Sequence, residues 1–144
     1  VAAVSSERLF DTFLQLIESL GDTCDVVLES SHERKTHPKE YRREGIERIL
    51  LESQLWDFED LLLNDGCTSI AVLHSEHPFE VQLDEHKLII AYGPVMHTFE
   101  TILSEHGVPQ KKNLRVISQG DHMHTSTNQF MSQFEDFASQ IHAE

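Results

Sequence analysis

The chain has 144 residues, of which 39% are hydrophobic and 25% are charged, and its formal net charge at pH 7 is −14. This composition is typical of a globular protein rather than a disordered one, and the length favours one domain over residues 1–144. The acidic balance argues against binding to nucleic acid or to an anionic membrane, and no apolar run approaches the ~20 residues that cross a bilayer. We therefore expect a cytoplasmic protein.

Two helices and one strand are predicted in the first half of the chain. Residues 5–20 carry apolar side chains at helical spacing, which favours a helix. Residues 24–30 contain a short apolar run that is typical of a strand. A second helix is predicted from about residue 40 to residue 64, and Gly66 is expected to end it in a left-handed conformation.

Residues 68–92 contain three short apolar runs separated by two polar breaks. The runs at 70–73 and 88–91 are apolar on both faces, as buried strands are. The run at 79–83 alternates between apolar and polar residues, as a half-solvated strand does. Because the breaks are too short for a crossover, the pattern predicts an antiparallel meander of three strands.

The last part of the chain alternates between helix and strand signals. Pro94 is well placed to begin a helix that Gly107 ends, and residues 114–118 are predicted to form a short strand. Ser126 and Gln129 have the spacing of a capping box, which predicts that a final amphipathic helix is capped by Ser126.

The resulting order of elements, α-β-α-β-β-β-α-β-α, predicts an α/β domain of mixed, α+β-like character with a five-stranded mixed sheet and helices packed on it. Two strand–helix–strand segments, at residues 24–74 and 87–118, favour right-handed crossovers between parallel strands. In that arrangement, only the strand at residues 79–83 runs against the others.

This topology predicts where a ligand would bind, because open α/β sheets bind ligands beyond the carboxyl ends of their parallel strands. His122 and His124 at this edge have the spacing of two side chains on one face of an extended segment, so both can reach one zinc ion. His74 or His77 would complete the metal site. The residues expected to support the ligands or to contact a bound molecule are Asp121, Glu76, His32, Ser30 and Tyr92. The alternative is that these are ordinary polar residues of strand-end loops.

Signatures of catalysis and of nucleotide binding are missing from the sequence. It contains no G-x-S-x-G nucleophile elbow and no glycine-rich phosphate loop. Cys24 and Cys67 form no C-x-x-C pair, and each begins a predicted strand at the end away from the histidines. We interpret both as buried thiols in a reducing compartment.

These observations favour a non-catalytic binding or regulatory module that needs no cofactor. Its partner would be a protein or a small ligand, and the exposed Trp56 would be an anchor in a homodimer unless it packs over a neighbouring helix. The alternative function is that of a metal-dependent, hydrolase-like enzyme in which the edge histidines bind zinc.

Overall fold

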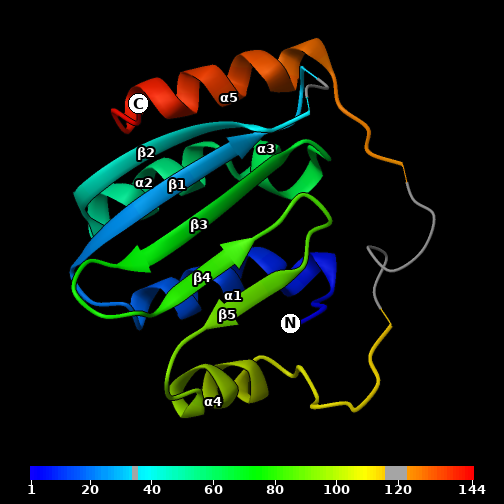
Figure 1. Ribbon diagram of the computed structural model, residues 1–144. Coiled ribbons are helices and arrows are strands. Elements are labelled where there is room, and N and C mark those ends of the chain that lie inside the picture. Colours follow the sequence, from blue (N-terminus) through cyan, green and yellow to red (C-terminus); the bar gives the residue numbers. More distant parts are fainter. Residues whose placement is uncertain (34–35, 116–122) are drawn as a thin grey trace.

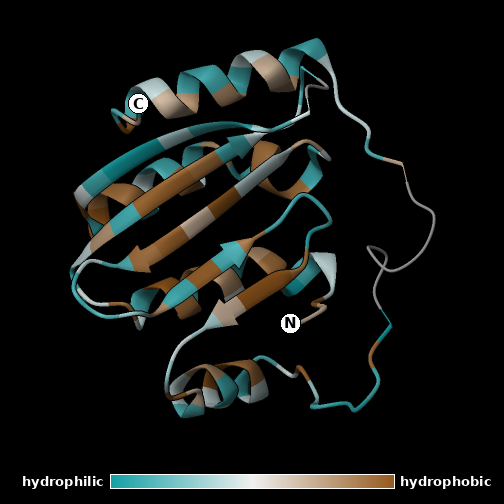
Figure 2. Cartoon of the chain, viewed as in Figure 1, coloured by the Kyte–Doolittle hydropathy of each residue, from teal (hydrophilic) through white to brown (hydrophobic). Residues whose placement is uncertain are grey.

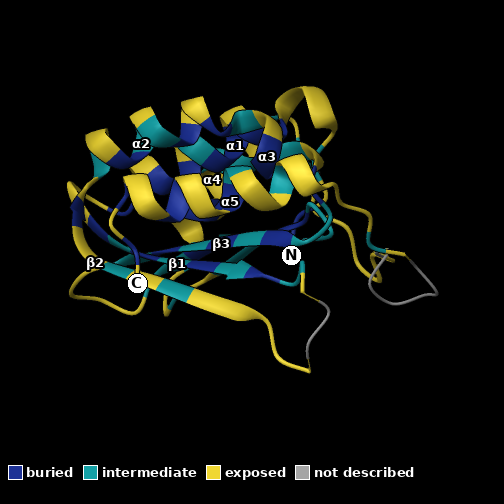
Figure 3. Ribbon diagram, turned by 90° about the horizontal axis from the view of Figure 1, so that it is seen from above, coloured by how far each residue is buried: buried dark blue, intermediate teal, exposed yellow. Residues whose placement is uncertain are grey.

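Five strands form one sheet, and helices are layered against one of its faces (Figures 1 and 3). The computed structural model describes residues 1–33, 36–115 and 123–144. The strands are β1 (Thr23–Ser30), β2 (Lys39–Glu47), β3 (Thr68–His74), β4 (Glu80–Leu83) and β5 (Ile89–Tyr92). The helices are α1 (Ser6–Glu18), α2 (Arg48–Asp57), α3 (Glu59–Asn64), α4 (His97–Glu105) and α5 (Asn128–Gln140). Within the described residues, none of the helices is long and apolar enough to cross a membrane.

Neighbouring strands are antiparallel throughout the sheet, which has the order β2-β1-β3-β4-β5. β1 runs against β3, with Leu28 opposite Ile70 and Ser30 opposite Thr68. The prediction of a mixed sheet with β1 parallel to β3 is therefore wrong, whereas a five-stranded sheet combined with helices is confirmed. The fold belongs to the α+β class, with an antiparallel sheet.

The reversal follows from β2, an additional strand in a region that the sequence assigns to a loop and the start of a helix. β2 forms a hairpin with β1, so the chain has changed direction before α2 begins. The predicted helix over residues 40–64 starts only at Arg48 and is divided at Phe58 into α2 and α3. Leu114 and Arg115 belong to no strand, and the other residues of the predicted strand at 114–118 lie outside the described part of the chain.

Several predicted elements are confirmed. α1 occupies most of residues 5–20, and β3, β4 and β5 form the predicted antiparallel meander. The last helix is also present, but its cap is Thr127 rather than Ser126: the Thr127 side chain accepts a hydrogen bond from the Phe130 amide.

The core lies between the helix layer and one face of the sheet. Along β1, buried residues alternate with half-buried ones, as expected where one sheet face is covered. The largest side chains without exposed surface include Phe13, Phe134 and Phe137 on the helices. Figure 2 shows the corresponding apolar colouring on β1 and β3, whereas β2 is mostly hydrophilic. Figure 3 shows that the helices turn their exposed sides away from the sheet.

Both outer strands are paired in part with residues near the ends of the chain. Ala2 forms a backbone bridge with Ile89 of β5. Glu144 exchanges two backbone hydrogen bonds with Arg42 of β2, at 2.8 and 2.9 Å. These contacts satisfy part of the backbone of two strands whose outer edges would otherwise face solvent.

Candidate metal centre

A polar cavity of about 660 Å³ lies at the end of the sheet where β1 finishes and β3 begins. Ser31 and His32, which follow β1, form part of its wall together with Cys67, which precedes β3. The turn between β4 and β5 contributes Glu85, and the segment that leads into α5 contributes His124. Four stretches that are far apart in the sequence therefore meet around one space.

Among the described residues, Glu85, His86 and His124 form a cluster that can hold a metal ion. Their candidate ligand atoms all lie within 4.8 Å of one another. The distance between His124 Nε2 and Glu85 Oε1 is 3.7 Å. In a tetrahedral zinc site with bonds of about 2.0–2.1 Å, ligand atoms are separated by roughly 3.3 Å. Small movements of these side chains would therefore bring the ligand atoms to the distances of a tetrahedral metal site.

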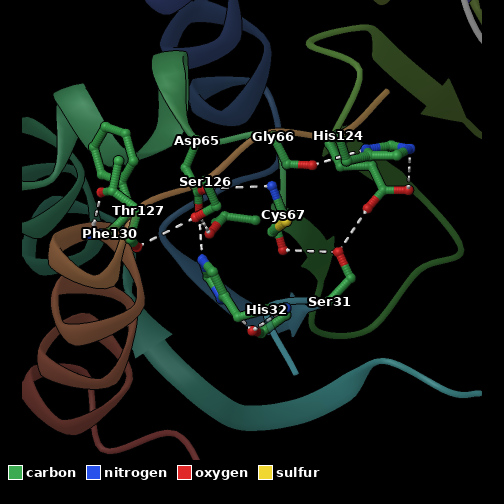
Figure 4. A network of polar contacts seen from close by, with 12 residues as sticks. Ser31, His32, Asp65, Gly66, Cys67, His124, Ser126, Thr127 and Phe130 are labelled. Carbon is green, nitrogen blue, oxygen red and sulfur yellow. Dashed lines mark hydrogen bonds and ion pairs between the residues drawn. The ribbon is translucent and has the colours of Figure 1, made fainter. Parts of the chain in front are cut away.

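Hydrogen bonds at Nδ1 orient both histidines. His124 Nδ1 lies 2.8 Å from the carbonyl oxygen of Gly66, and His86 Nδ1 lies 3.1 Å from Asp84 Oδ2 (Figure 4 shows the His124 contact). In the neutral rings, donation to these acceptors places the proton on Nδ1 and the lone pair on Nε2. Histidines that bind metals usually donate their other ring N–H to a carboxylate or a backbone carbonyl in this way.

The turn that carries Glu85 and His86 is held by Asp84. One oxygen of this carboxylate accepts hydrogen bonds from the backbone amides of His86 and Leu88, each at 2.9 Å. Lys87 adopts a left-handed conformation with φ of 62°, which closes the turn. Its ammonium group donates to the Thr68 carbonyl, and burial lowers the pKa of Lys87 to about 8. The turn between β4 and β5 is thus held by hydrogen bonds to its backbone amides and by the side-chain contact of Lys87 with Thr68.

A buried histidine–carboxylate pair lies next to the cluster. His32 Nε2 is 2.6 Å from Asp65 Oδ2, and the two side chains are only 2% and 0% exposed. Asp65 also accepts hydrogen bonds from the Thr68 hydroxyl at 2.5 Å and from the Cys67 amide at 3.3 Å. The buried carboxylate therefore has three donors, which is what a charge removed from water requires.

Ser30, His32 and Asp65 are connected in the same sequence as a serine–histidine–aspartate triad. The Ser30 hydroxyl contacts His32 Nδ1, and His32 Nε2 contacts Asp65. However, Ser30 is 7% exposed and is not among the described residues that line the cavity. Because a substrate in the cavity does not reach the Ser30 oxygen, the three residues are better explained as a buried support than as a nucleophile.

The structure separates the residues that the sequence grouped at one edge. His124, His32 and Ser30 lie near the cavity, where β1 ends. His74 is opposite Cys24 at the other end of β3, about 20 Å away for a strand of this length. The ring of His74 accepts hydrogen bonds from the backbone amides of Glu76 and His77, so it caps a turn there.

Tyr92 lies opposite Glu80, at the same end of the sheet as His74, and is 53% exposed. These separations follow from the antiparallel pairing of β1 with β3, which places the end of one strand beside the start of the other. His122 and Asp121 lie outside the described residues, so their part of the metal-site hypothesis stays a prediction.

The sequence reading misses Glu85, His86, Cys67 and Asp65. The four-residue break after β4 reads as a hairpin turn, and only the correct strand directions bring it next to His124. Cys67 is at the cavity, contrary to the interpretation that both cysteines lie away from the histidines, whereas Cys24 is buried at the other end of β1. Gly66 is not left-handed: a side chain there would lie 2.7 Å from the Thr125 carbonyl oxygen, so close backbone approach requires the glycine.

Comparison of the chain with protein-family models, with curated proteins and with solved structures finds no match. Function is therefore inferred from the geometry of this chain's own residues.

Proposed function

We propose that the protein binds a divalent transition-metal ion through Glu85, His86 and His124, and that the ion presents an open coordination position to a small ligand in the cavity. The observation that carries this proposal is the orientation of the two histidines. Each has an acceptor at Nδ1, which directs the lone pair of the neutral ring to Nε2. Their candidate ligand atoms and that of Glu85 lie within 4.8 Å of one another.

The types of ligand favour particular metals. Two imidazoles with one carboxylate suit zinc, iron, cobalt or nickel, whereas calcium and magnesium prefer sites made of oxygen atoms. Zinc sites with three protein ligands commonly keep a fourth position for water or a bound molecule. The position of Glu85 and His124 in the cavity wall supports access of a small ligand to such a position.

Electrostatics also support cation binding. Two neutral imidazoles and the Glu85 carboxylate would carry one negative charge, so a divalent ion would leave the centre with a net charge of about +1. The formal charge of −14 on the chain attracts cations and disfavours free anions. A ligand with an oxygen donor would be held by the ion and by hydroxyl groups of the wall.

A binding module agrees with the missing catalytic signatures in the sequence. The open coordination position favours a second candidate function, that of a metal-dependent hydrolase. Metal-bound water has a pKa near 7 in several zinc enzymes, which makes it a nucleophile at neutral pH. A hydrolase would release p-nitrophenol from p-nitrophenyl esters or phosphates only when metal-loaded. A pure binding module would bind metal without that activity.

The test is calorimetric titration of metal-free protein with Zn²⁺, supported by the visible spectrum after addition of Co²⁺. We expect binding of one ion, and a loss of at least about 100-fold in affinity for His124→Ala, because a ligand is removed outright. His77→Ala is the matched control, since His77 is an exposed histidine at the other end of the sheet. Equal affinities of the unmodified protein and His124→Ala would contradict the proposed site, as would absence of binding in the unmodified protein.

A further inference from the structure

The buried pair of His32 and Asp65 touches two segments that also support the candidate metal ligands. Asp65 immediately precedes Gly66, and His32 immediately follows Ser31. Gly66 contacts His124, whereas Ser31 contacts Glu85, so the pair lies one residue away from the support of each ligand (Figure 4).

On the Asp65 side, the backbone of Gly66 docks the segment that carries His124. The Gly66 amide donates to the Thr125 carbonyl at 3.0 Å, and the Gly66 carbonyl accepts from His124 Nδ1 at 2.8 Å. A side chain at Gly66 would collide with the backbone of Thr125, at 2.7 Å from its oxygen and 2.9 Å from its nitrogen. The direction of the Gly66 carbonyl therefore sets the orientation of the His124 ring.

On the His32 side, Ser31 connects the end of β1 to the second ligand. The Ser31 amide donates to the Cys67 carbonyl at 2.9 Å, and its hydroxyl donates to Glu85 Oε2 at 3.1 Å. The residues around Asp65 and those around His32 are thus joined by the buried His32–Asp65 contact and by the Ser31–Cys67 hydrogen bond, beside the pairing of Ser30 with Thr68 where β1 ends and β3 begins. Both contacts lie between the backbone that supports His124 and the side chain that contacts Glu85.

We propose that His32 and Asp65 are positioning residues for the metal centre. Their buried contact fixes the positions of Gly66 and Ser31, which in turn orient His124 and Glu85. This inference rests on the proposed metal-binding function. Outer hydrogen-bonding partners of metal ligands typically change metal affinity by 10–100-fold when they are removed. Because the pair acts one step further out, its effect must pass through the orientation of the His124 ring, which can be observed without metal.

The experiment compares the unmodified protein with His32→Leu and His32→Gln. Leucine cannot donate to Asp65, whereas the glutamine amide can replace the N–H of His32 Nε2. For His32→Leu we expect about a tenfold loss of Zn²⁺ affinity by calorimetry. Nitrogen chemical shifts of the His124 ring in metal-free protein should also lose their bias toward the tautomer protonated at Nδ1. For His32→Gln we expect the Zn²⁺ affinity and the His124 ring shifts to remain close to those of the unmodified protein.

Thr12→Val controls for general destabilisation, because Thr12 is a buried residue with hydroxyl contacts to Arg8 and His106, away from the cavity. It should lower the melting temperature without changing Zn²⁺ affinity or the His124 ring shifts. A folded His32→Leu protein with unchanged ring shifts and unchanged affinity would overturn the positioning role.

If His32→Leu does not fold, Gly66→Ala tests the same connection, because the added carbon displaces the segment that carries His124. It should alter the His124 ring shifts and weaken Zn²⁺ binding, and unchanged values would overturn the proposal. Absence of Zn²⁺ binding in the unmodified protein would remove the proposed function. The ring shifts of metal-free variants would still decide whether His32 positions His124.

Discussion

Cys24 and Cys67 show how one sheet gives two thiols different environments. Cys24 lies under the helix layer without exposed surface, whereas Cys67 is half-buried in the cavity wall. Burial raises the pKa of Cys24 to about 11, and nearby acids including Asp25 add to this, while Arg48 opposes it. An acid whose pKa is raised in the folded state keeps its proton at pH values where the unfolded chain has lost it.

We predict that Cys24 makes the folded state less stable as pH rises from about 9 to 11. In this range the unfolded state binds fewer protons, so the free energy of unfolding falls by about 1.4 kcal/mol per pH unit for one group. The measurement is urea unfolding at pH 8.5 and 10.5 for the unmodified protein, Cys24→Ala and Cys67→Ala. The fall should be smaller in Cys24→Ala, with Cys67→Ala as the matched control.

Lys87 must be separated from this effect. Its pKa is lowered from 10.5 to about 8, so between these values the unfolded chain holds a proton that the folded protein has released. Lys87 therefore contributes stability that increases with pH, which is opposite in sign to the contribution of Cys24. Because Lys87 is present in both proteins, the difference between the unmodified protein and Cys24→Ala isolates Cys24. An identical pH dependence in Cys24→Ala and the unmodified protein would refute the prediction.

At the scale of elements, the sequence predicts those whose apolar pattern matches their burial. α1, β1, β4 and α5 each bury one face, and the period of their apolar residues reflects it. β3 and β5 are apolar on both faces in sequence, but β3 is fully buried on only one face, and β5 includes the exposed Tyr92. β2 does not follow this rule. Its first seven residues, 39–45, are all exposed or half-buried, and they include Arg42, Arg43 and Glu44. Pairing with β1 makes these residues a strand despite their helix propensity.

The strand β2 also determines how much of the candidate site could be predicted from the sequence. Adding a strand between β1 and α2 reverses the direction of the chain, so residues at the end of β1 meet the start of β3. His32 and His124 then share an edge with the turn that contains Glu85, whereas His74 moves to the opposite edge. Histidine spacing alone carries no information about strand direction, so it could indicate His124 as a candidate ligand but could not indicate Glu85 and His86 as its neighbours.

The cap of α5 gives a prediction for one element. The Thr127 hydroxyl accepts from the Phe130 amide at 3.1 Å, whereas Ser126 makes only a 3.5 Å contact with a carbonyl. Thr127→Ala should lower the free energy of unfolding by about 1 kcal/mol, because an unsatisfied amide is left at the helix start. Ser126→Ala is the matched control and should have a much smaller effect in urea unfolding. A larger loss for Ser126→Ala would instead support the capping box expected from sequence.

For the whole molecule, charge predicts solution behaviour. Protonation of all ten histidines would change the formal charge from −14 to −4. Because mutual repulsion between molecules then decreases, we expect solubility to fall between pH 7.5 and 5.5. Precipitation by polyethylene glycol at constant ionic strength measures this, and the pH effect should shrink when salt screens the charges. Equal or higher solubility at pH 5.5 would show that charge repulsion does not control it.

The spacing of the candidate ligands along the chain has a consequence for when the centre can form. Glu85 and His86 come from one turn, whereas His124 enters only after α4 and the long connection that follows it. During synthesis, the first two ligands would leave the ribosome well before the third. Closing so long a loop costs chain entropy, which ordering of the sheet must offset before an ion finds all three side chains. If the ion binds as proposed, it would stabilise a sheet that has already formed rather than start the folding of that sheet.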